Sequence, residues 1–263
     1  MARAVIALLT DFGLRDHYVG TMKGVALAIC PEATFIDITH DIPPQDVLAG
    51  ALELAACFRY FPAGTIFLVV VDPGVGSSRR GLAAEAGEHR FIAPDNGVLT
   101  AVFRDTPPKR VVELSERRYA RATVSRTFEG RDRFAPAAGW LARGVDLAAL
   151  GRAAGDWRPL DIPQPVAGDR ELAGEVLRVD HFGNLVTNID RGTFDRFARH
   201  GAIQIRAGQH AIEHLVTTYG DVAPGAICAL FGSTEQLEIA ANAASAALVL
   251  GLGRGAPVRV ARG

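Results

Sequence analysis

The sequence predicts an α/β fold, with an N-terminal domain built on a mostly parallel sheet with helices on both faces and a C-terminal antiparallel β-barrel domain. Apolar runs of strand length alternate with helical periods through the first half, an order typical of parallel sheets. Residues 66–71 (IFLVVV) are six consecutive apolar residues, as expected of a strand buried on both faces. Beyond residue 170, short strands and turns replace this alternation, which favours an antiparallel barrel or sandwich.

Local signals predict the elements of the N-terminal half one by one. Tyr18, Met22, Val25 and Ile29 recur at helical spacing, and a proline follows them. Asp46 is placed to cap the next helix. Strands are predicted at residues 4–10, 34–38, 66–71, 81–86, 89–93 and 110–114, and helices at residues 15–30, 47–58, 98–103 and in an alanine-rich segment ending at residue 141.

Polar clusters follow four of these predicted strands directly. They are Asp11, the segment 39–41, Asp72, and the pair Asp95 and Asn96. The carboxyl ends of parallel strands share one edge of the sheet, where open α/β sheets bind ligands. One such cluster is usually a turn capped by its own acid, but four on one edge predict a ligand cleft.

The C-terminal third has a β pattern. Residues 155–168 are rich in proline and glycine, so the domains are predicted at 1–155 and 171–263 with a linker at 156–170. A hairpin is predicted from strands at 175–179 and 185–189, and Asn242 is placed to cap a short turn at 243–247. Further strands are predicted at residues 202–206, 226–231, 236–239 and 258–261.

Composition excludes several kinds of partner. The net charge is −1 and the basic residues form no stripe, so no nucleic-acid partner is expected. Cys30, Cys57 and Cys228 are far apart, which predicts a reducing compartment, hence a cytoplasmic protein, and no zinc site. No apolar run is long enough to span a bilayer, so no membrane partner is expected.

The loop that follows residues 66–71 carries the most chemistry. It reads DPGVGSSRR, and it places Asp72 a few residues from Arg79 and Arg80. The loop lacks the lysine and the glycine spacing of phosphate-binding loops, so a metal-dependent phosphate-processing hydrolase is the weakest of three functional hypotheses. His17, His40 and Asp41 lack metal-ligand spacing, and no metal is expected.

Seven blocks, in order along nearly the whole chain, resemble one family. They are LTDFG with DHYVG, DITHDIPPQD, VVDPGVGSSRR, APDNG, TFEGRDRFAP, VDHFGNLVTN and GSTEQLEIAANAASA. This set resembles the S-adenosyl-L-methionine hydroxide adenosyltransferases, relatives of the fluorinase and chlorinase. The resemblance implies a hydrolase that displaces methionine from C5′ of S-adenosyl-L-methionine with water or hydroxide, giving adenosine and L-methionine. It also implies a homotrimer with the site at the subunit interface, and no cofactor or metal beyond the substrate.

The resemblance also implies roles for substrate-binding residues. Asp11 would hold the ribose hydroxyls, and Asp16 would lie near the methionine moiety. Asp180 would take the methionine ammonium. Carboxylates suit these roles because the substrate carries a sulfonium and an ammonium. Further residues that the resemblance places around the ribose and adenine are Phe182, Asn184, Ser233, Asn242 and Ala243.

The catalytic set of the family is an Asp, an Arg and a His, and this chain departs from it at one position. Asp72 and Arg79 match the first two, but the block that usually reads TFHGRD has Glu129 in place of the histidine. Glutamate is the weaker base at neutral pH. Our hypothesis is that Glu129 positions or deprotonates water; the alternative is a non-catalytic S-adenosylmethionine or adenosine-binding protein. Gln45 replaces an aromatic residue of the halogenating relatives and, with Asp72, favours water over halide.

Overall fold

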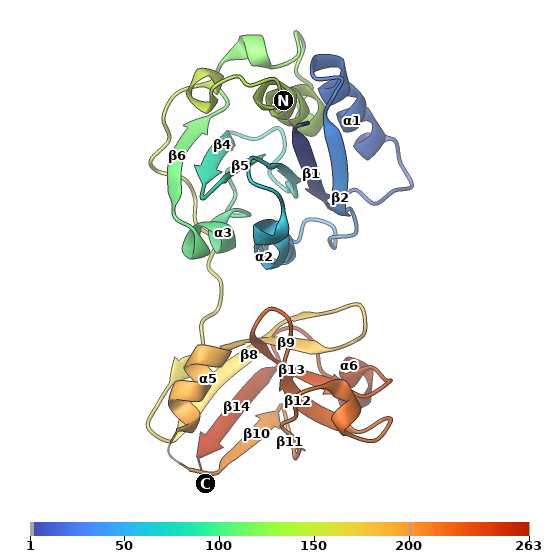
Figure 1. The fold of residues 1–263 in the computed structure, drawn as a ribbon, viewed down its shortest axis with the longest axis vertical. Coiled ribbons are helices and arrows are strands. Elements are labelled where there is room, and N and C mark those ends of the chain that lie inside the picture. Colours follow the sequence, from blue (N-terminus) through green and yellow to red (C-terminus); the bar gives the residue numbers. More distant parts are fainter. Residues whose placement is uncertain (1–2, 200, 263) are drawn as a thin grey trace. The chain divides into compact units, whose positions relative to one another are not determined.

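The computed structural model describes residues 3–199 and 201–262, which divide into two units, Met1–Asp161 and Ile162–Gly263 (Figure 1). Within the described residues, no helix combines the length and the apolar character needed to cross a bilayer. The finer domain boundaries at residues 155 and 171 stay predictions.

A six-stranded sheet in the order β2-β1-β3-β5-β4-β6 organises the N-terminal unit. Neighbours among β2, β1, β3 and β5 run parallel, whereas β4 is antiparallel to both β5 and β6. The mostly parallel sheet predicted from the sequence is therefore confirmed. Its strands are β1 (Val5–Thr10), β2 (Thr34–Thr39), β3 (Ile66–Val70), β4 (Gly81–Ala86), β5 (His89–Pro94) and β6 (Pro108–Glu113).

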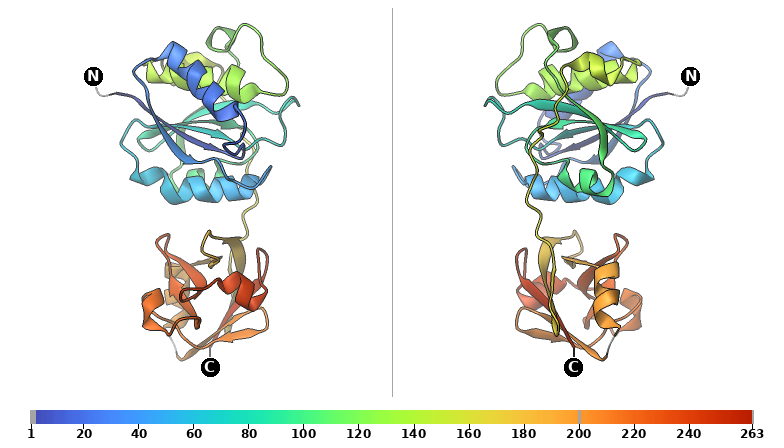
Figure 2. Two further views of the ribbon diagram at one scale, coloured as in Figure 1. Left: turned by 90° about the vertical axis from the view of Figure 1, so that its right-hand side faces the viewer. Right: turned by 90° about the vertical axis from the view of Figure 1, so that its left-hand side faces the viewer.

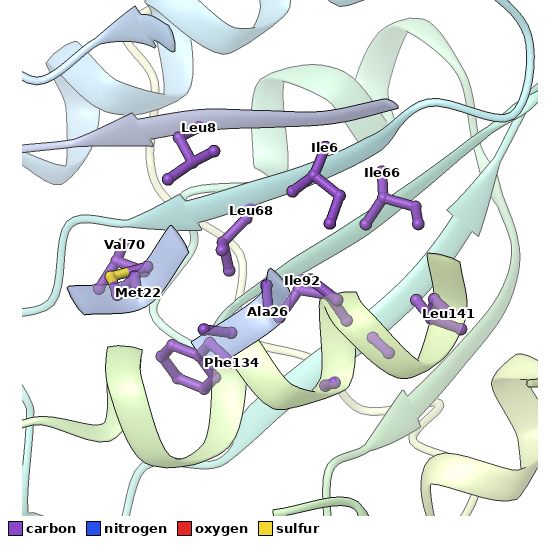
Figure 3. Packing of buried hydrophobic residues seen from close by; sticks show 14 of the residues in the cluster. Ile6, Leu8, Met22, Ala26, Ile66, Leu68, Val70, Ile92, Phe134 and Leu141 are labelled. Carbon is purple, nitrogen blue, oxygen red and sulfur yellow. The ribbon is translucent and has the colours of Figure 1, made fainter. Parts of the chain in front are cut away.

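Helices cover both faces of this sheet, as Figure 2 shows. On one face lie α1 (Tyr18–Ile29) and α4 (Ala135–Ala142), and on the other lie α2 (Val47–Cys57) and α3 (Thr100–Asp105). Alternate residues of β1 serve the two faces, because successive side chains of a strand point in opposite directions. Ile6 and Leu8 pack with Met22 of α1 and Phe134 (Figure 3), whereas Leu9 packs in the other cluster.

Short helical turns complete the unit. They are η1 (Phe58–Tyr60), η2 (Arg117–Tyr119), the π-helix η3 (Gly130–Phe134) and η4 (Leu147–Leu150). The Asp46 cap is confirmed, since its carboxylate accepts a 3.0 Å hydrogen bond from the Ala49 amide. The helix expected from residue 98 begins at Thr100, because Asn96 Oδ1 accepts from the Val98 amide at 3.2 Å and holds that segment in a turn.

The C-terminal unit is an antiparallel, nearly closed barrel-like sheet in the order β11-β10-β14-β8-β9-β13-β12, with β7 paired to β8. A bridge between Leu215 and Ala229 of β12 joins the segment after β11 to the other edge strand. The predicted barrel is confirmed. Its strands are β7 (Val166–Ala167), β8 (Glu171–Val179), β9 (Leu185–Asp190), β10 (Ile203–Ala207), β11 (His210–Ile212), β12 (Ile227–Phe231), β13 (Gln236–Ala241) and β14 (Pro257–Arg262).

Several features of this unit differ from the sequence prediction, which also lacked β7 and β11. A helix, α5 (Arg191–Ala198), follows β9, and its cap Asp190 accepts from the Thr193 amide at 2.8 Å. The predicted Asn242 cap is wrong: Ser245 caps α6 (Ala246–Leu250) by accepting from the Leu248 amide at 3.2 Å. Asn242 instead donates to the Val222 carbonyl at 2.7 Å, a tertiary contact that sequence spacing does not reveal.

Candidate active site

The topology brings the predicted polar clusters to one edge of the N-terminal sheet. Strands β2, β1, β3 and β5 are parallel, so the residues after them lie along a common edge. Asp11 and Asp72 are close enough there for their charges to interact. Asp95 has a structural role instead, because its carboxylate accepts from Arg80 Nη2 at 2.7 Å and from the Arg158 amide at 2.7 Å.

Asp72, Arg79 and Glu129 form one buried cluster at this edge. Arg79 Nε donates to the two carboxylate oxygens of Asp72 at 2.8 and 3.0 Å, and Nη2 also donates to Oδ2. The same Nη2 lies 2.7 Å from Glu129 Oε2. The side chains of Asp72, Arg79 and Glu129 are only 5%, 4% and 11% exposed, so the pairing takes place largely away from bulk solvent. The guanidinium group of Arg79 thus forms ion pairs with both carboxylates.

The loop after β3 is shaped to return Arg79 to Asp72. The Ser77 amide donates to the Gly74 carbonyl at 3.1 Å, and Ser77 Oγ accepts from the Arg79 amide at 3.2 Å. Gly76 has a φ of +77°, and a Cβ there would overlap the Arg126 carbonyl oxygen. The loop can therefore follow this path only with glycine at position 76.

Gly76→Ala is expected to lower the free energy of unfolding by about 2–4 kcal/mol, since it adds both left-handed strain and a backbone clash. Urea unfolding followed by tryptophan fluorescence measures this, because both tryptophans, Trp140 and Trp157, lie in the N-terminal unit. The control is Gly20→Ala in α1, where nothing lies within 4 Å of an added Cβ and a small stabilisation is expected. Equal effects of the two substitutions would contradict the prediction.

A π-helix positions Glu129 beside Arg79. Glu129 immediately precedes η3, and a single π turn of this kind is frequently found at functional sites. Within η3, the fully buried Asp132 accepts from Arg131 Nε at 2.7 Å and from the Ser125 amide at 2.8 Å. These bonds tie the incoming loop to the helix and hold Glu129 toward Arg79.

The electrostatics keep Arg79 charged and leave hydrogen-bonding capacity in the cluster. Burial alone would lower the pKa of Arg79, but the hydrogen bonds to Asp72 and the negative charges of Asp72 and Glu129 outweigh burial and raise it. Arg79 Nη1 is buried and has no acceptor among the described residues. Glu129 Oε2 is near Nη2 but is not aligned as a hydrogen-bond acceptor. One donor and one acceptor of this buried cluster are thus left without a hydrogen-bond partner among the described residues.

Asp11 is held at the end of β1 by a strained neighbour. Its Oδ2 accepts from the Gln45 amide at 2.7 Å, and Gln45 has a φ of +67°, unusual for a residue with a side chain. Burial raises the pKa of Asp11, and the charge of Asp72 adds to the rise, while the Gln45 hydrogen bond opposes it. A partly buried carboxylate with a raised pKa is a candidate functional residue, so the predicted role of Asp11 stays open to test.

Asp11→Asn is expected to stabilise the N-terminal unit slightly at neutral pH, by about 0.5 kcal/mol because the group is only half buried. A carboxyl whose pKa is raised on folding costs stability as pH rises through the interval between its unfolded and folded pKa values. The gain should therefore vanish at acidic pH, where the carboxyl is protonated in both states. Urea unfolding at both pH values measures it, and a loss of stability at neutral pH would contradict the prediction.

Sequence reasoning missed an aromatic cluster beside these acids. The rings of Tyr18 and Phe128 meet edge to face with centroids 5.0 Å apart, and Phe12 lies 5.7 Å from Tyr18. Phe12 follows Asp11 and Phe128 precedes Glu129, so the cluster links the two halves of the site. The sequence did carry a signal for this cluster, because an aromatic residue stands next to the acid in both motifs. Asp16 is exposed and makes no side-chain hydrogen bond or ion pair within the described residues, so its role stays a prediction.

The C-terminal unit has its own pocket, of about 920 Å³, around the β8–β9 turn. Asp180 Oδ1 accepts from the amides of Phe182 and Asn184 at 2.9 and 2.8 Å, and Oδ2 accepts from Asn184 Nδ2 at 2.8 Å. The turn thereby leaves Phe182 74% exposed at the pocket. Ser233 and Ala243 also line the pocket, whereas Asn242 does not.

Glu238 and Tyr219 are pocket residues that sequence reasoning missed. Glu238 is buried, and its Oε2 accepts from the Tyr219 hydroxyl at 3.1 Å. Burial raises the pKa of Glu238, and burial together with Glu238 raises the pKa of Tyr219 to about 12. Glu238 lies within a strand whose pattern predicts only core residues, so no sequence signal singled it out.

The fold and the two sites define a class of two-domain protein. One site, rich in carboxylates, lies at the edge of an α/β sheet, and the other lies on a β-barrel. The chain belongs to the SAM hydroxide adenosyltransferase family: the N-terminal domain of that family matches residues 6–151, and its C-terminal domain matches residues 174–259.

Individual relatives match over nearly their full length. The chain is 39% identical to a (R)-S-adenosyl-L-methionine hydrolase from Salinispora tropica, with 98% of each chain covered. It is 37% identical to a protein of the same name from Thermus thermophilus, covering 97% of this chain and 98% of the relative. It also matches the crystal structure of an uncharacterized conserved protein from Thermotoga maritima with a TM-score of 0.92 and 36% identity, covering 98% of this chain and 100% of the other.

Proposed function

We propose that this protein hydrolyses S-adenosyl-L-methionine to adenosine and L-methionine. The observation that carries the proposal is 39% identity, over 98% of both chains, to a relative named for that activity. In the reaction, a water oxygen bonds to C5′ while the C5′–S bond breaks. Its electron pair goes to sulfur, which becomes the neutral thioether of methionine, and the water loses one proton.

In this proposal the buried cluster acts on the attacking water. Glu129 accepts the proton, because its Oε2 is not aligned with any hydrogen-bond donor among the described residues. Arg79 donates from its unpaired Nη1 to the water oxygen and holds both carboxylates in place. Asp72 orients Arg79 through the bonds from Nε. Fixing the nucleophile in this way favours in-line displacement because it removes the entropy cost of an encounter.

Carboxylates of both units are proposed to bind the cationic substrate. Asp11 takes the ribose hydroxyls, supported by its position beside Asp72 and by the raised pKa that marks an acid kept against stability. Asp180 takes the methionine ammonium, with the exposed ring of Phe182 and the amide of Asn184 at the ribose and adenine. Ser233 and Ala243, which line the C-terminal pocket, are proposed around the adenine. Asn242 is proposed there and Asp16 near the methionine on the family resemblance alone.

Assembly and location follow the family resemblance. We propose a homotrimer in which the N-terminal unit of one subunit and the C-terminal unit of the next share the substrate. The reaction is proposed to use no metal or cofactor, so a chelator should leave the rate unchanged. A cytoplasmic location is supported by the free thiols of Cys30, Cys57 and Cys228.

Incubation of the pure protein with S-adenosyl-L-methionine in ¹⁸O-water tests the activity. We expect adenosine and methionine in equal amounts, with the label in the 5′-hydroxyl of adenosine and none in methionine. A heat-inactivated sample is the control. Absence of adenosine above that control, or unlabelled adenosine, would overturn the proposal.

A second candidate function is a non-catalytic binding protein for S-adenosylmethionine or adenosine. It is favoured by the pairing of Glu129 with Arg79, which would neutralise a residue standing where the family has histidine. Calorimetry followed by chromatography of the ligand distinguishes the two functions. Tight binding with the ligand recovered intact selects the binding protein, whereas turnover selects the hydrolase.

A further inference from the structure

A second concave site lies on the N-terminal unit, in the segment that joins β6 to the π-helix η3. It has a volume of about 600 Å³ and is lined by residues 114–118, residues 120–124 and Arg133. None of the predicted catalytic or substrate-binding residues lines it. The size suits a small molecule, because ligand pockets typically enclose several hundred cubic ångströms.

The lining of this pocket carries a local excess of positive charge. Four arginines, Arg117, Arg118, Arg121 and Arg133, line it together with a single acid, Glu116. The whole chain has a net charge of −1, so the excess is a local feature and not a reflection of overall composition.

Two of the four arginines, Arg117 and Arg118, have no ion pair within the described residues, and the ion pairs of Arg121 and Arg133 are long, at 3.5 and 3.8 Å. Arg117 makes no ion pair or side-chain hydrogen bond within the described residues, and Arg118 only stacks over Tyr119 at 4.8 Å. Arg121 Nε is 3.5 Å from Asp132 Oδ1, but that carboxylate already accepts from Arg131 at 2.7 Å. The guanidinium groups of Arg117 and Arg118 are thus available to an anion in the pocket, and those of Arg121 and Arg133 are held only by long ion pairs.

Backbone donors add to the arginines. In the part of the chain that the structure describes, the amides of residues 122, 123 and 124 donate to no protein acceptor, although all three residues line the pocket. Free main-chain amides beside guanidinium groups are a donor set that matches phosphate oxygens, since arginine presents a planar fork of N–H groups.

We propose that this pocket binds a small anion with two linked phosphate groups, such as pyrophosphate or a nucleoside diphosphate. Two phosphates suit four guanidinium groups better than one carboxylate does, because each phosphate accepts several charge-assisted hydrogen bonds. A nucleic acid fits less well, since the charge lies in a hollow of one segment and forms no stripe along the surface.

Arg133 connects this pocket to the proposed catalytic cluster. Its Nη1 is 3.8 Å from Glu129 Oε2, the oxygen that also faces Arg79, while the side chain lines the pocket. An anion in the pocket competes with Glu129 for Arg133 and so reduces the positive charge around that carboxylate. Anion binding should therefore change the rate of the proposed reaction, and this part of the inference rests on the proposed function.

Calorimetric titration with inorganic pyrophosphate at low ionic strength tests the binding. We expect one site on the wild-type chain and an affinity at least about tenfold weaker in Arg117→Ala/Arg118→Ala, because two charge-assisted contacts are lost. The matched control is Arg59→Ala/Arg104→Ala, which removes two exposed arginines outside the pocket. Titration with ADP separates a nucleotide from a simple pyrophosphate as the preferred ligand.

The proposed site would be overturned if the wild type and Arg117→Ala/Arg118→Ala bound pyrophosphate with equal affinity. It would also be overturned if the control variant lost as much affinity as Arg117→Ala/Arg118→Ala. Circular dichroism confirms that each variant is folded. The coupling has a separate readout: pyrophosphate should change turnover at least about twofold in the wild type and not in Arg133→Ala. Binding without a change in turnover overturns the coupling alone, and because calorimetry needs no turnover, failure of the proposed function leaves the binding test intact.

Discussion

Arg79→Met is expected to destabilise the N-terminal unit by about 3–5 kcal/mol and to abolish turnover. The substitution removes the cation that Asp72 and Glu129 share, and the side chains of these two acids are only 5% and 11% exposed. It leaves two buried carboxylates close together, with Arg133 at 3.8 Å as a remaining cation beside Glu129. An uncompensated buried charge is far more costly than a lost surface ion pair. Tryptophan fluorescence during urea unfolding measures the effect, because Trp140 and Trp157 both report on this unit.

A second substitution separates lost charge compensation from lost packing. Adding Asp72→Asn to Arg79→Met removes one of the two carboxylates that lose Arg79, so the double variant should recover part of the stability. Arg59→Met serves as the matched control: Arg59 pairs with Asp105 at 2.9 Å, but both side chains are about half exposed, so a change of at most about 1 kcal/mol is expected. An additive double variant would show that packing over Phe134, 5.2 Å from the guanidinium carbon, dominates instead.

Glu129→Gln is expected to lower kcat by about 10²- to 10⁴-fold with little change in KM, because the amide keeps the shape of the side chain but cannot accept a proton. Stability should change less than in Arg79→Met, since Arg79 retains Asp72 as a partner. Steady-state release of adenosine across a range of pH values measures the rate.

Two further variants make this result specific to proton transfer. Glu129→His restores the residue of the family motif and should retain more activity than Glu129→Gln. Glu113→Gln, which alters an exposed ion pair with Arg152 at 3.0 Å, should leave kcat unchanged. If Glu129→Gln turned over at the wild-type rate, Glu129 would be a structural partner of Arg79 and not a base.

Much of the fold could be predicted because local signals and tertiary contacts agree in it. Residues 66–71 predict a central strand, and β3 occupies the middle of the parallel sheet with all its residues buried. Asp46 predicts a helix start and caps α2. Helix α5 was missed because its short amphipathic pattern, built on Phe194 and Phe197, lies between strands, where the β pattern dominates.

The candidate site could be predicted only in part. Asp72 and Arg79 are seven residues apart on one loop, so their pairing follows from local sequence. The pairing of Glu129 with Arg79 joins positions 50 residues apart and depends on the π-helix after Glu129, which no periodicity predicts. The free arginines at 117 and 118 appear in the sequence as an ordinary exposed turn, and only the structure places them with Arg133 around one hollow.

The amino-acid sequence by itself determined the order of strands and main helices in the N-terminal unit, the acids at its strand ends and the family to which the chain belongs. These depend on residues close together in the chain, where hydrophobic period, capping and turn chemistry act directly. Only the tertiary structure decided which charges meet: Glu129 with Arg79 and Arg133, Asp11 with the Gln45 amide, and Glu238 with Tyr219. The physical reason is that electrostatic and hydrogen-bonding partners depend on distance and burial in space, which separation along the chain does not encode.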